Sequence, residues 1–136
     1  MSYSSVATEA PLLIGVIDPD PVSRADLSSL LRGMGAEVLT FESAESYLLA
    51  DPPVQPACLI VDILLPGMSG LEFLRRLRDS DAHVPVILLA DESDVPTAVA
   101  AMREGATDFI EKPYVGVAVL KQVRKLLEST NRAMQS

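Results

Sequence analysis

The sequence is poor in cysteine and contains no long apolar run. Its single cysteine, Cys58, excludes an internal disulfide framework, and the apolar neighbours of this residue indicate a core position rather than a reactive thiol. The longest strongly apolar stretch, residues 84–90, is far shorter than the roughly 20 residues that span a bilayer, and residues 1–10 lack a signal-peptide pattern. We therefore expect a cytoplasmic protein that does not associate with membranes.

Basic residues are also few. The chain has 19 Asp and Glu against 11 Lys and Arg, which gives a net charge of −8. Binding to nucleic acid is driven largely by basic residues, so we expect no direct nucleic-acid binding by this segment. With 136 residues, 49% of them hydrophobic, the chain fits one domain with a substantial core.

Five short runs rich in branched apolar residues predict strands, at residues 12–17, 37–41, 57–62, 85–90 and 108–111. Each run is followed by apolar residues spaced three or four apart, which is typical of helices, although the helix at residues 43–49 is short. Gly33 ends the first helix, Ser69 and Glu72 form a capping box, and Asp94 precedes a further helix. Five strand-helix repeats with right-handed crossovers predict an α/β fold, a five-stranded parallel sheet with helices on both faces.

Acidic and basic side chains follow several of these strands. Asp18 and Asp20 come after the first, Asp62 ends the third, Asp91 follows the fourth and Lys112 follows the fifth. In such a sheet the site lies beyond the carboxyl ends of the strands. Each Asp taken singly is more often a helix cap or turn former. Together, however, an accessible carboxylate beside another acid and an amine could accept a phosphoryl group, with a divalent cation screening the charge.

The motifs VIDPD, LIVDILLPGMSGLEFL, PVILLA and GATDFIEKP carry a resemblance. In their order and spacing, the chain resembles the receiver domain of two-component response regulators, and VPTAVAAMREGATDFIEKPY is similar to the FixJ-like subfamily. The resemblance covers residues 11–129, which leaves residues 1–10 as a flexible N-terminal segment and 130–136 as a C-terminal tail. It implies the flavodoxin-like (β/α)5 receiver fold.

The resemblance also implies roles for individual residues. Asp62 matches the phosphoacceptor, and Lys112 matches the lysine that contacts the phosphoryl oxygens. Magnesium would be held by Asp18, by Asp62 and by the backbone carbonyl of Leu64. The peptide bond before Pro113 is typically cis in the family. Implied partners are a histidine kinase or small phosphodonor, and a second copy of the chain that pairs through the fourth and fifth strand-helix units.

Two positions depart from the family pattern. The second acidic residue, a direct metal ligand in the family, falls on Pro19, and the switch Ser or Thr falls on Ala90. Proline has no side-chain oxygen, and alanine cannot donate the hydrogen bond that couples phosphorylation to the aromatic switch residue, here Phe109. Asp20 either substitutes for the missing ligand or caps the helix that follows. We therefore expect an atypical receiver with weakened magnesium binding and weakened switching.

Three alternatives stay open. A conventional phosphorylation switch and a phosphorylation-independent interaction module both fit the same motifs. An enzyme is the third alternative, because IGVIDPDPV loosely fits the DxDx[TV] signature of haloacid-dehalogenase-like phosphatases. That chemistry needs a hydroxyl where Ala90 stands and an acidic pair after Lys112 that is not present. We therefore expect a signalling domain in a phosphorelay that serves transcription regulation, and not an enzyme.

Overall fold

The structure, a computed structural model of the chain, describes residues 12–80 and 82–135, with side chains described up to residue 129. The N-terminal segment expected at residues 1–10 lies outside the described residues.

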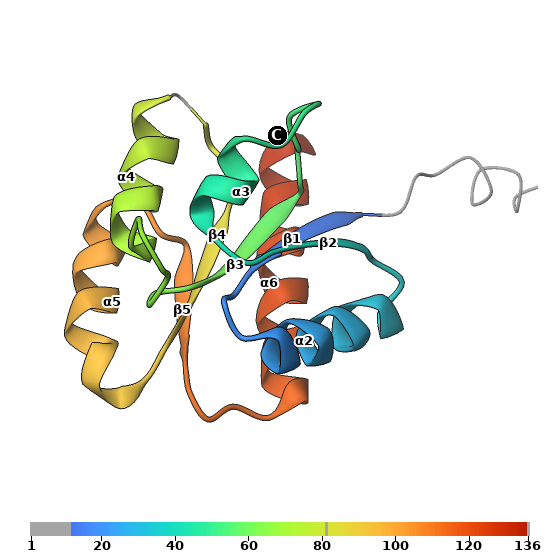
Figure 1. Cartoon of the computed structure of the whole chain (residues 1–136). Helices are drawn as coiled ribbons and strands as arrows, with labels where there is room; N and C mark the ends of the chain where they lie inside the picture. The colour runs from blue at the N-terminus through green and yellow to red at the C-terminus, as the bar shows by residue number, and fades with distance from the viewer. Residues whose placement is uncertain (1–11, 81, 136) are drawn as a thin grey trace, which may run out of the picture.

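The five strands form one parallel sheet (Figure 1). They are β1 (Leu13–Ile17), β2 (Glu37–Phe41), β3 (Cys58–Asp62), β4 (Val86–Ala90) and β5 (Asp108–Glu111). Their order across the sheet is β2-β1-β3-β4-β5, which is the flavodoxin-like doubly wound order. The predicted fold is confirmed, and each predicted strand agrees with the observed one to within a residue.

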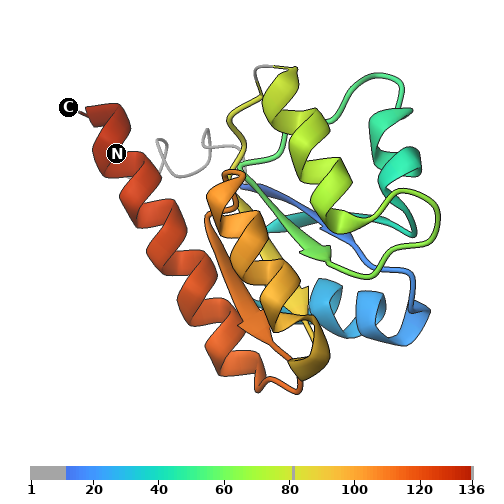
Figure 2. The same cartoon turned by 90° about the vertical axis from the view of Figure 1, so that its left-hand side faces the viewer.

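Helices cover both faces of the sheet (Figures 1 and 2). One face carries α3 (Ala44–Leu48), α4 (Gly70–Asp79) and α5 (Val95–Arg103), and the other carries α2 (Pro21–Gly33) and α6 (Gly116–Gln135). Alternate strand residues supply the two cores, because successive side chains of a strand point to opposite faces. In β3, for example, Leu59 and Val61 pack with α4, while Ile60 packs with α2 and α6.

The helix ends follow their sequence signals. Ser69 Oγ accepts a hydrogen bond from Glu72 N at 3.1 Å, which is one of the two hydrogen bonds of the predicted capping box. Asp94 precedes α5 as expected, although its carboxylate makes no capping hydrogen bond. A short 3-10 helix, η1 (Glu92–Asp94), connects β4 to α5 and was not predicted.

The last helix is longer than the sequence analysis predicts. Residues 130–136 are expected to be a tail, whereas α6 continues to Gln135. No glycine or proline interrupts this segment, and Arg, Ala, Met and Gln favour helices, which explains the extension. Among the described residues, no helix is both long and apolar enough to cross a membrane.

Gly70 allows α4 to begin directly against the end of β3. A Cβ atom at this position would lie 2.9 Å from the Cα of Ile63 and 3.1 Å from the carbonyl oxygen of Asp62, and both neighbours are backbone. Gly70 N also donates to the Ile63 carbonyl oxygen at 3.1 Å. Glycine at this position therefore fixes the path of the chain that follows Asp62.

We expect Gly70→Ala to lower the free energy of unfolding by about 1–3 kcal/mol, because the backbone must move to admit the methyl group. Gly33→Ala is the matched control, since nothing lies within 4 Å of a Cβ at that helical position. This control should stabilise the protein by up to about 1 kcal/mol through helix propensity. Urea denaturation measures both, and equal effects would contradict the close approach at Gly70.

Candidate functional site

Three strands deliver Asp18, Asp62 and Lys112 to one edge of the sheet, the lower edge in Figure 1. Asp18 follows β1, Asp62 ends β3, and Lys112 follows β5. Lys112 Nζ donates to Asp62 Oδ2 at 2.5 Å. The carboxylate and the amine that the sequence analysis placed together are thus in direct contact.

Asp62 is an almost buried carboxylate, with 7% of its surface exposed. Its Oδ2 atom accepts from Lys112, and its Oδ1 atom accepts from Leu64 N at 2.9 Å. Leu64, expected to serve through its carbonyl oxygen, thus contributes its N–H group in the structure. Both oxygens of Asp62 have a donor, as a buried charge requires.

Asp18 is completely buried and is held by its own helix connection. Its Oδ1 atom accepts from Asp20 N at 2.9 Å, and its Oδ2 atom accepts from Ser23 Oγ at 2.6 Å. Arg24 Nη1 donates to the Asp18 carbonyl oxygen at 2.7 Å, which places a positive charge near this carboxylate. The N-cap residue and the first turn of α2 therefore supply the hydrogen-bond donors that the buried Asp18 requires.

Lys112 is the cation of this pocket. Burial alone would lower the pKa of its amine, but the hydrogen bond and the charge of Asp62, with smaller contributions from Asp18 and Asp91, outweigh burial and raise the pKa of Lys112. The amine is therefore protonated throughout the physiological pH range. It offsets part of the negative charge that the carboxylates bring to this edge.

Asp20 is the N-cap residue of α2. Its carboxylate accepts from Val22 N at 3.2 Å, and its side chain is exposed. Pro21 is the first residue of the helix, a position at which proline is favoured, and Asp is favoured at the cap position before it. Of the two roles left open for Asp20, the structure displays the helix cap. Pro19 is exposed and adds no side-chain oxygen to the pocket.

The end of β4 carries no hydroxyl group. Ala90 is buried with 1% of its surface exposed, and Phe109 on β5 packs partly buried against the core cluster to which Ala90 belongs. The Lys112–Pro113 peptide bond is cis. Ala90 and Phe109, the residues expected to form the switch, thus both lie on the α5 side of the sheet. Ala90 has no polar side-chain group that could donate a hydrogen bond there.

The donor set fits a magnesium ion incompletely. Two carboxylates, Asp18 and Asp62, lie at this edge, and Mg²⁺ commonly takes one or two carboxylates and keeps several waters. However, within the part of the chain that the structure describes, no group of three or more His, Cys, Asp or Glu residues is placed to hold a metal ion. All four oxygens of the two carboxylates also accept internal hydrogen bonds.

Ser23, Arg24 and Tyr114 also border the site, although the sequence motifs do not indicate them. Ser23 and Tyr114 line a cavity of about 530 Å³ beside Lys112, together with Asp20, Val22, Asp26, Asp91 and Pro113. Burial raises the pKa of Tyr114, and the neighbouring Ser23 side chain and the charge of Lys112 act in the opposite direction. A helix that begins at Pro21 brings its first turn back over the end of β1. The predicted helix start could therefore have indicated that Ser23 contacts Asp18.

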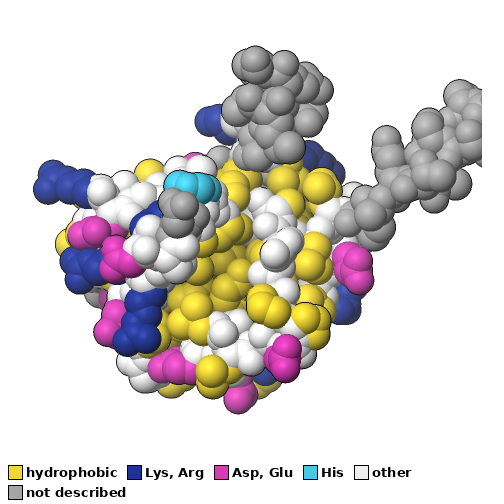
Figure 3. Space-filling view, turned by 90° about the horizontal axis from the view of Figure 1, so that it is seen from above, with side chains coloured by type: hydrophobic (Ala, Val, Ile, Leu, Met, Phe, Trp, Pro, Cys, Tyr) yellow, Lys and Arg dark blue, Asp and Glu magenta, His cyan; other side chains and the backbone are white. Residues whose placement is uncertain are grey.

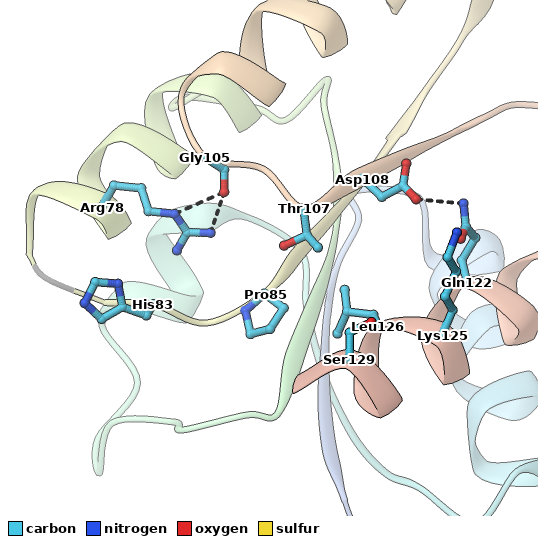
Figure 4. Close-up of a pocket in the computed structure, with 10 residues that line it drawn as sticks. All are labelled: Arg78, His83, Pro85, Gly105, Thr107, Asp108, Gln122, Lys125, Leu126 and Ser129. Carbon is cyan, nitrogen blue, oxygen red and sulfur yellow. Dashed lines mark hydrogen bonds between the residues drawn. The ribbon is translucent and has the colours of Figure 1, made fainter. Parts of the chain in front are cut away.

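A second cavity, also of about 530 Å³, lies at the opposite edge of the sheet and contains none of the expected site residues (Figure 4). Seen from this edge, apolar side chains gather in a hollow with the single histidine at its rim (Figure 3). Arg78 closes one side by donating to the carbonyl oxygens of Ala82, Val84 and Gly105. These contacts are structural, because they join two loops at the amino ends of β4 and β5.

The chain matches known proteins over most of its length. A family model described as the response regulator receiver domain matches residues 14–128. The transcriptional regulatory protein FixJ of Azorhizobium caulinodans is 41% identical over 116 residues, which are 85% of this chain and 55% of that protein. The C4-dicarboxylate transport transcriptional regulatory protein DctD of Pseudomonas aeruginosa is 42% identical over 120 residues, 88% of this chain and 26% of that protein.

Solved structures agree with these sequence relatives. Full-length FixJ from B. japonicum superposes with a TM-score of 0.86 at 31% identity, covering 93% of this chain and 63% of that one. NtrX from Brucella abortus gives a TM-score of 0.85 at 29% identity, covering 93% of this chain and 29% of that one. The chain thus spans about half the length, or less, of the curated relatives described above. The fold, the carboxylate edge and these matches together show that the chain belongs to the receiver domain family of two-component response regulators.

Proposed function

We propose that Asp62 is the phosphoacceptor of this receiver domain, and that the domain is an atypical one with weakened magnesium binding and weakened switching. The observation that supports the first statement is the contact between Asp62 and Lys112 at the carboxyl edge of the sheet. It leaves one nucleophilic carboxylate next to one fixed cation, in a pocket that also contains Asp18.

The proposed reaction is a phosphoryl transfer. An oxygen of Asp62 attacks the phosphorus of a phosphohistidine or a small acyl phosphate, the bond from phosphorus to the donor breaks, and the donor leaves with the electron pair. Lys112 can then pair with the new phosphoryl oxygens, because its amine already lies against the attacking carboxylate. Receiver domains in general work with histidine kinases or small phosphodonors, and we propose the same partners here.

Weakened magnesium binding follows from the loop after β1. When bound, the cation would screen the charge between the carboxylates and the phosphoryl group. Asp18, Asp62 and the Leu64 carbonyl oxygen would hold it, whereas Pro19 supplies no oxygen and Asp20 caps α2. Affinity for a divalent cation depends on the number and charge of its ligands, so one carboxylate fewer should lower it.

Weakened switching follows from Ala90. A phosphoryl group changes a conformational equilibrium only through unequal contacts in the two states, and alanine at the end of β4 removes one such contact. We also propose homodimer formation through the fourth and fifth strand-helix units. Val99 and Met102 on α5, which are 46% and 37% exposed, support an apolar contact there. Through its whole protein, the domain would serve transcription regulation, as the names of its relatives suggest.

Two other functions compete with this proposal. A phosphorylation-independent interaction module is favoured by the four carboxylate oxygens that are already hydrogen-bonded within the protein. It differs in requiring no chemistry at Asp62. The phosphatase alternative is set aside, because the chain belongs to a family of signalling modules.

Incubation with acetyl phosphate and magnesium should add one phosphoryl group to the wild-type chain, and Asp62→Asn should add none. Asparagine preserves the shape of the site but removes the nucleophile. Intact-protein mass spectrometry measures the adduct. Asp91→Asn is the control, because this exposed acid lines the cavity beside Lys112 and its substitution removes the same charge. An adduct that persists in Asp62→Asn would refute the assignment, and no adduct in any variant would favour the interaction module.

Pro19→Asp should tighten magnesium binding by about tenfold, which corresponds to about 1.4 kcal/mol. The substitution restores a carboxylate next to Asp18. Pro21→Asp adds the same charge two residues later, at the first position of α2, and should give a much smaller gain. Isothermal titration calorimetry with magnesium chloride measures both affinities. Equal gains in the two variants would show that net charge, and not a missing ligand, limits binding.

Ala90→Thr should enlarge the response of Phe109 to beryllofluoride and magnesium, because it restores the hydroxyl group. One net hydrogen bond of about 1 kcal/mol would shift the two-state equilibrium about fivefold. Ala90→Val is the control, since valine has the shape of threonine without its oxygen. Amide and aromatic NMR spectra of each variant, with and without the phosphoryl mimic, measure the response. If the valine variant responds as strongly, packing alone explains the effect.

A further inference from the structure

The connection between β3 and α4, residues 63–69, is tied to α3 by one side chain. Glu45 on α3 accepts a hydrogen bond at Oε2 from Met68 N at 2.9 Å, and the connection runs beside that helix (Figure 2). In the described part of the chain, no other hydrogen bond joins residues 64–69 to an element outside β3 and α4. Glu45 therefore holds the segment that directly follows Asp62.

The carboxylate of Glu45 also lies directly against Gly67. A Cβ atom at Gly67 would lie 2.6 Å from Glu45 Oε2 and 3.3 Å from its Cδ. The φ angle of Gly67 is 69°, in the left-handed region that glycine adopts without strain. Glycine thus lets the carboxylate reach the backbone of the connection, and the side chain of Met68 is buried in the core cluster that contains Ala44 and Tyr47 of α3. These contacts hold the connection in one path.

Glu45 is ionised at neutral pH. The hydrogen bond from Met68 N lowers the pKa of Glu45, and the charge of Arg76 acts in the same direction, although burial opposes both. The second carboxylate oxygen, Oε1, is buried and has no hydrogen-bond partner among the described residues. Such a placement is costly for a carboxylate oxygen. Glu45 thus orders the backbone of the connection at the expense of its own solvation.

Leu64 is the residue at which this connection meets the carboxylate pocket. Its N–H group donates to Asp62 Oδ1 at 2.9 Å, and its side chain is 59% exposed, so the core does not hold it. In the proposed function, its carbonyl oxygen is a ligand of the cation. A ligand that is already held in place costs less to order when the cation binds, and the groups that orient ligands tune the affinity of the site.

We propose that Glu45 is a positioning residue for the cation site. By holding Met68 it fixes the path of residues 63–69 and with it the carbonyl oxygen of Leu64. This inference rests on the proposed function of the Asp18 and Asp62 pocket. It makes α3, which lies outside the sequence motifs of the family, a support of that pocket.

The first test uses the metal-free protein and does not depend on phosphorylation. The amide proton of Met68 should move upfield and exchange faster in Glu45→Ala, which removes its acceptor, than in the wild type. Glu45→Gln should keep the wild-type position, because its side-chain oxygen can still accept. The amide of Val22, which donates to Asp20 Oδ1 at the start of α2, is the internal reference. An unchanged Met68 amide in Glu45→Ala would show that the contact is absent.

The second test measures magnesium binding by isothermal titration calorimetry. Glu45→Ala and Glu45→Asp should bind magnesium about tenfold more weakly than the wild type, and Glu45→Gln nearly as well. Aspartate keeps the charge but is one methylene too short to reach Met68, whereas glutamine keeps the reach without the charge. Glu42→Gln, which removes an exposed charge three residues earlier, is the control and should bind as the wild type does. Tight binding by Glu45→Asp with weak binding by Glu45→Gln would show that charge acts, and would overturn the positioning role.

The third test follows the initial rate of phosphorylation by acetyl phosphate as magnesium is varied. In Glu45→Ala the magnesium concentration at half-maximal rate should rise about tenfold, while the rate at saturating magnesium should stay within about twofold of wild type. The saturating rate is kept because Asp62 and Lys112 retain their contact. A merely structural role would instead lower the saturating rate through loss of folded protein and leave the half-maximal concentration unchanged.

The outcomes separate this inference from the function on which it rests. If the wild type binds magnesium and takes up the phosphoryl group, and Glu45→Ala does both with unchanged magnesium dependence, the inference is wrong while the pocket still functions. If the wild type does neither, the proposed function fails and the positioning role fails with it, whereas the Met68 amide still decides whether the contact exists. Urea denaturation of each variant establishes that it is folded before these comparisons.

Discussion

The ion pair between Lys112 and Asp62 determines how this end of the molecule is built. A carboxylate at the end of a fully buried strand is costly unless a donor or a cation meets it, and Lys112 provides both. The pair joins β3 to the residue after β5, across the intervening strand β4. Lys112 N also donates to the Ala90 carbonyl oxygen at 2.8 Å, so the backbone that carries the amine is fixed by the end of β4.

Asp18 solves the same physical problem with different groups. Its carboxylate accepts hydrogen bonds from a backbone N–H and a serine hydroxyl. These donors come from the N-cap residue Asp20 and from Ser23 in the first turn of α2, so the position of Asp18 depends on where that helix begins. The sequence Asp-Pro-Asp-Pro sets this start, because Asp20 caps the helix and Pro21 opens it. Pro19 thus belongs to a segment that also orders a buried carboxylate.

Much of the fold and part of the site could be predicted from the sequence, for identifiable reasons. The strands are short runs of branched apolar residues, and their carboxyl ends in a parallel sheet must share one edge, so Asp62 and Lys112 could be placed together. Signals for helix ends are weaker where several residue types favour a helix, and for that reason the extension of α6 to Gln135 was not foreseen. The contact of Ser23 with Asp18 is local and follows from the start of α2 at Pro21. Tyr114 could not be placed, because the cavity that it lines joins a helix turn to a loop about 90 positions later in the chain, which no local pattern encodes.

We propose that Pro19 and Ala90, the two departures from the family pattern, act on different steps. On this proposal, Pro19 lowers the affinity of the pocket for a cation, whereas Ala90 weakens the conformational response of the α5 face to phosphorylation. A ligand shifts an equilibrium only by its unequal affinity for two states. In a domain with alanine at position 90, that difference in affinity must come from other groups that contact the pocket. Those groups are Lys112 on the β5 side and the hydroxyl of Ser23 on the α2 side. Lys112 directly precedes the connection between β5 and α6, so any remaining response should be strongest in that connection.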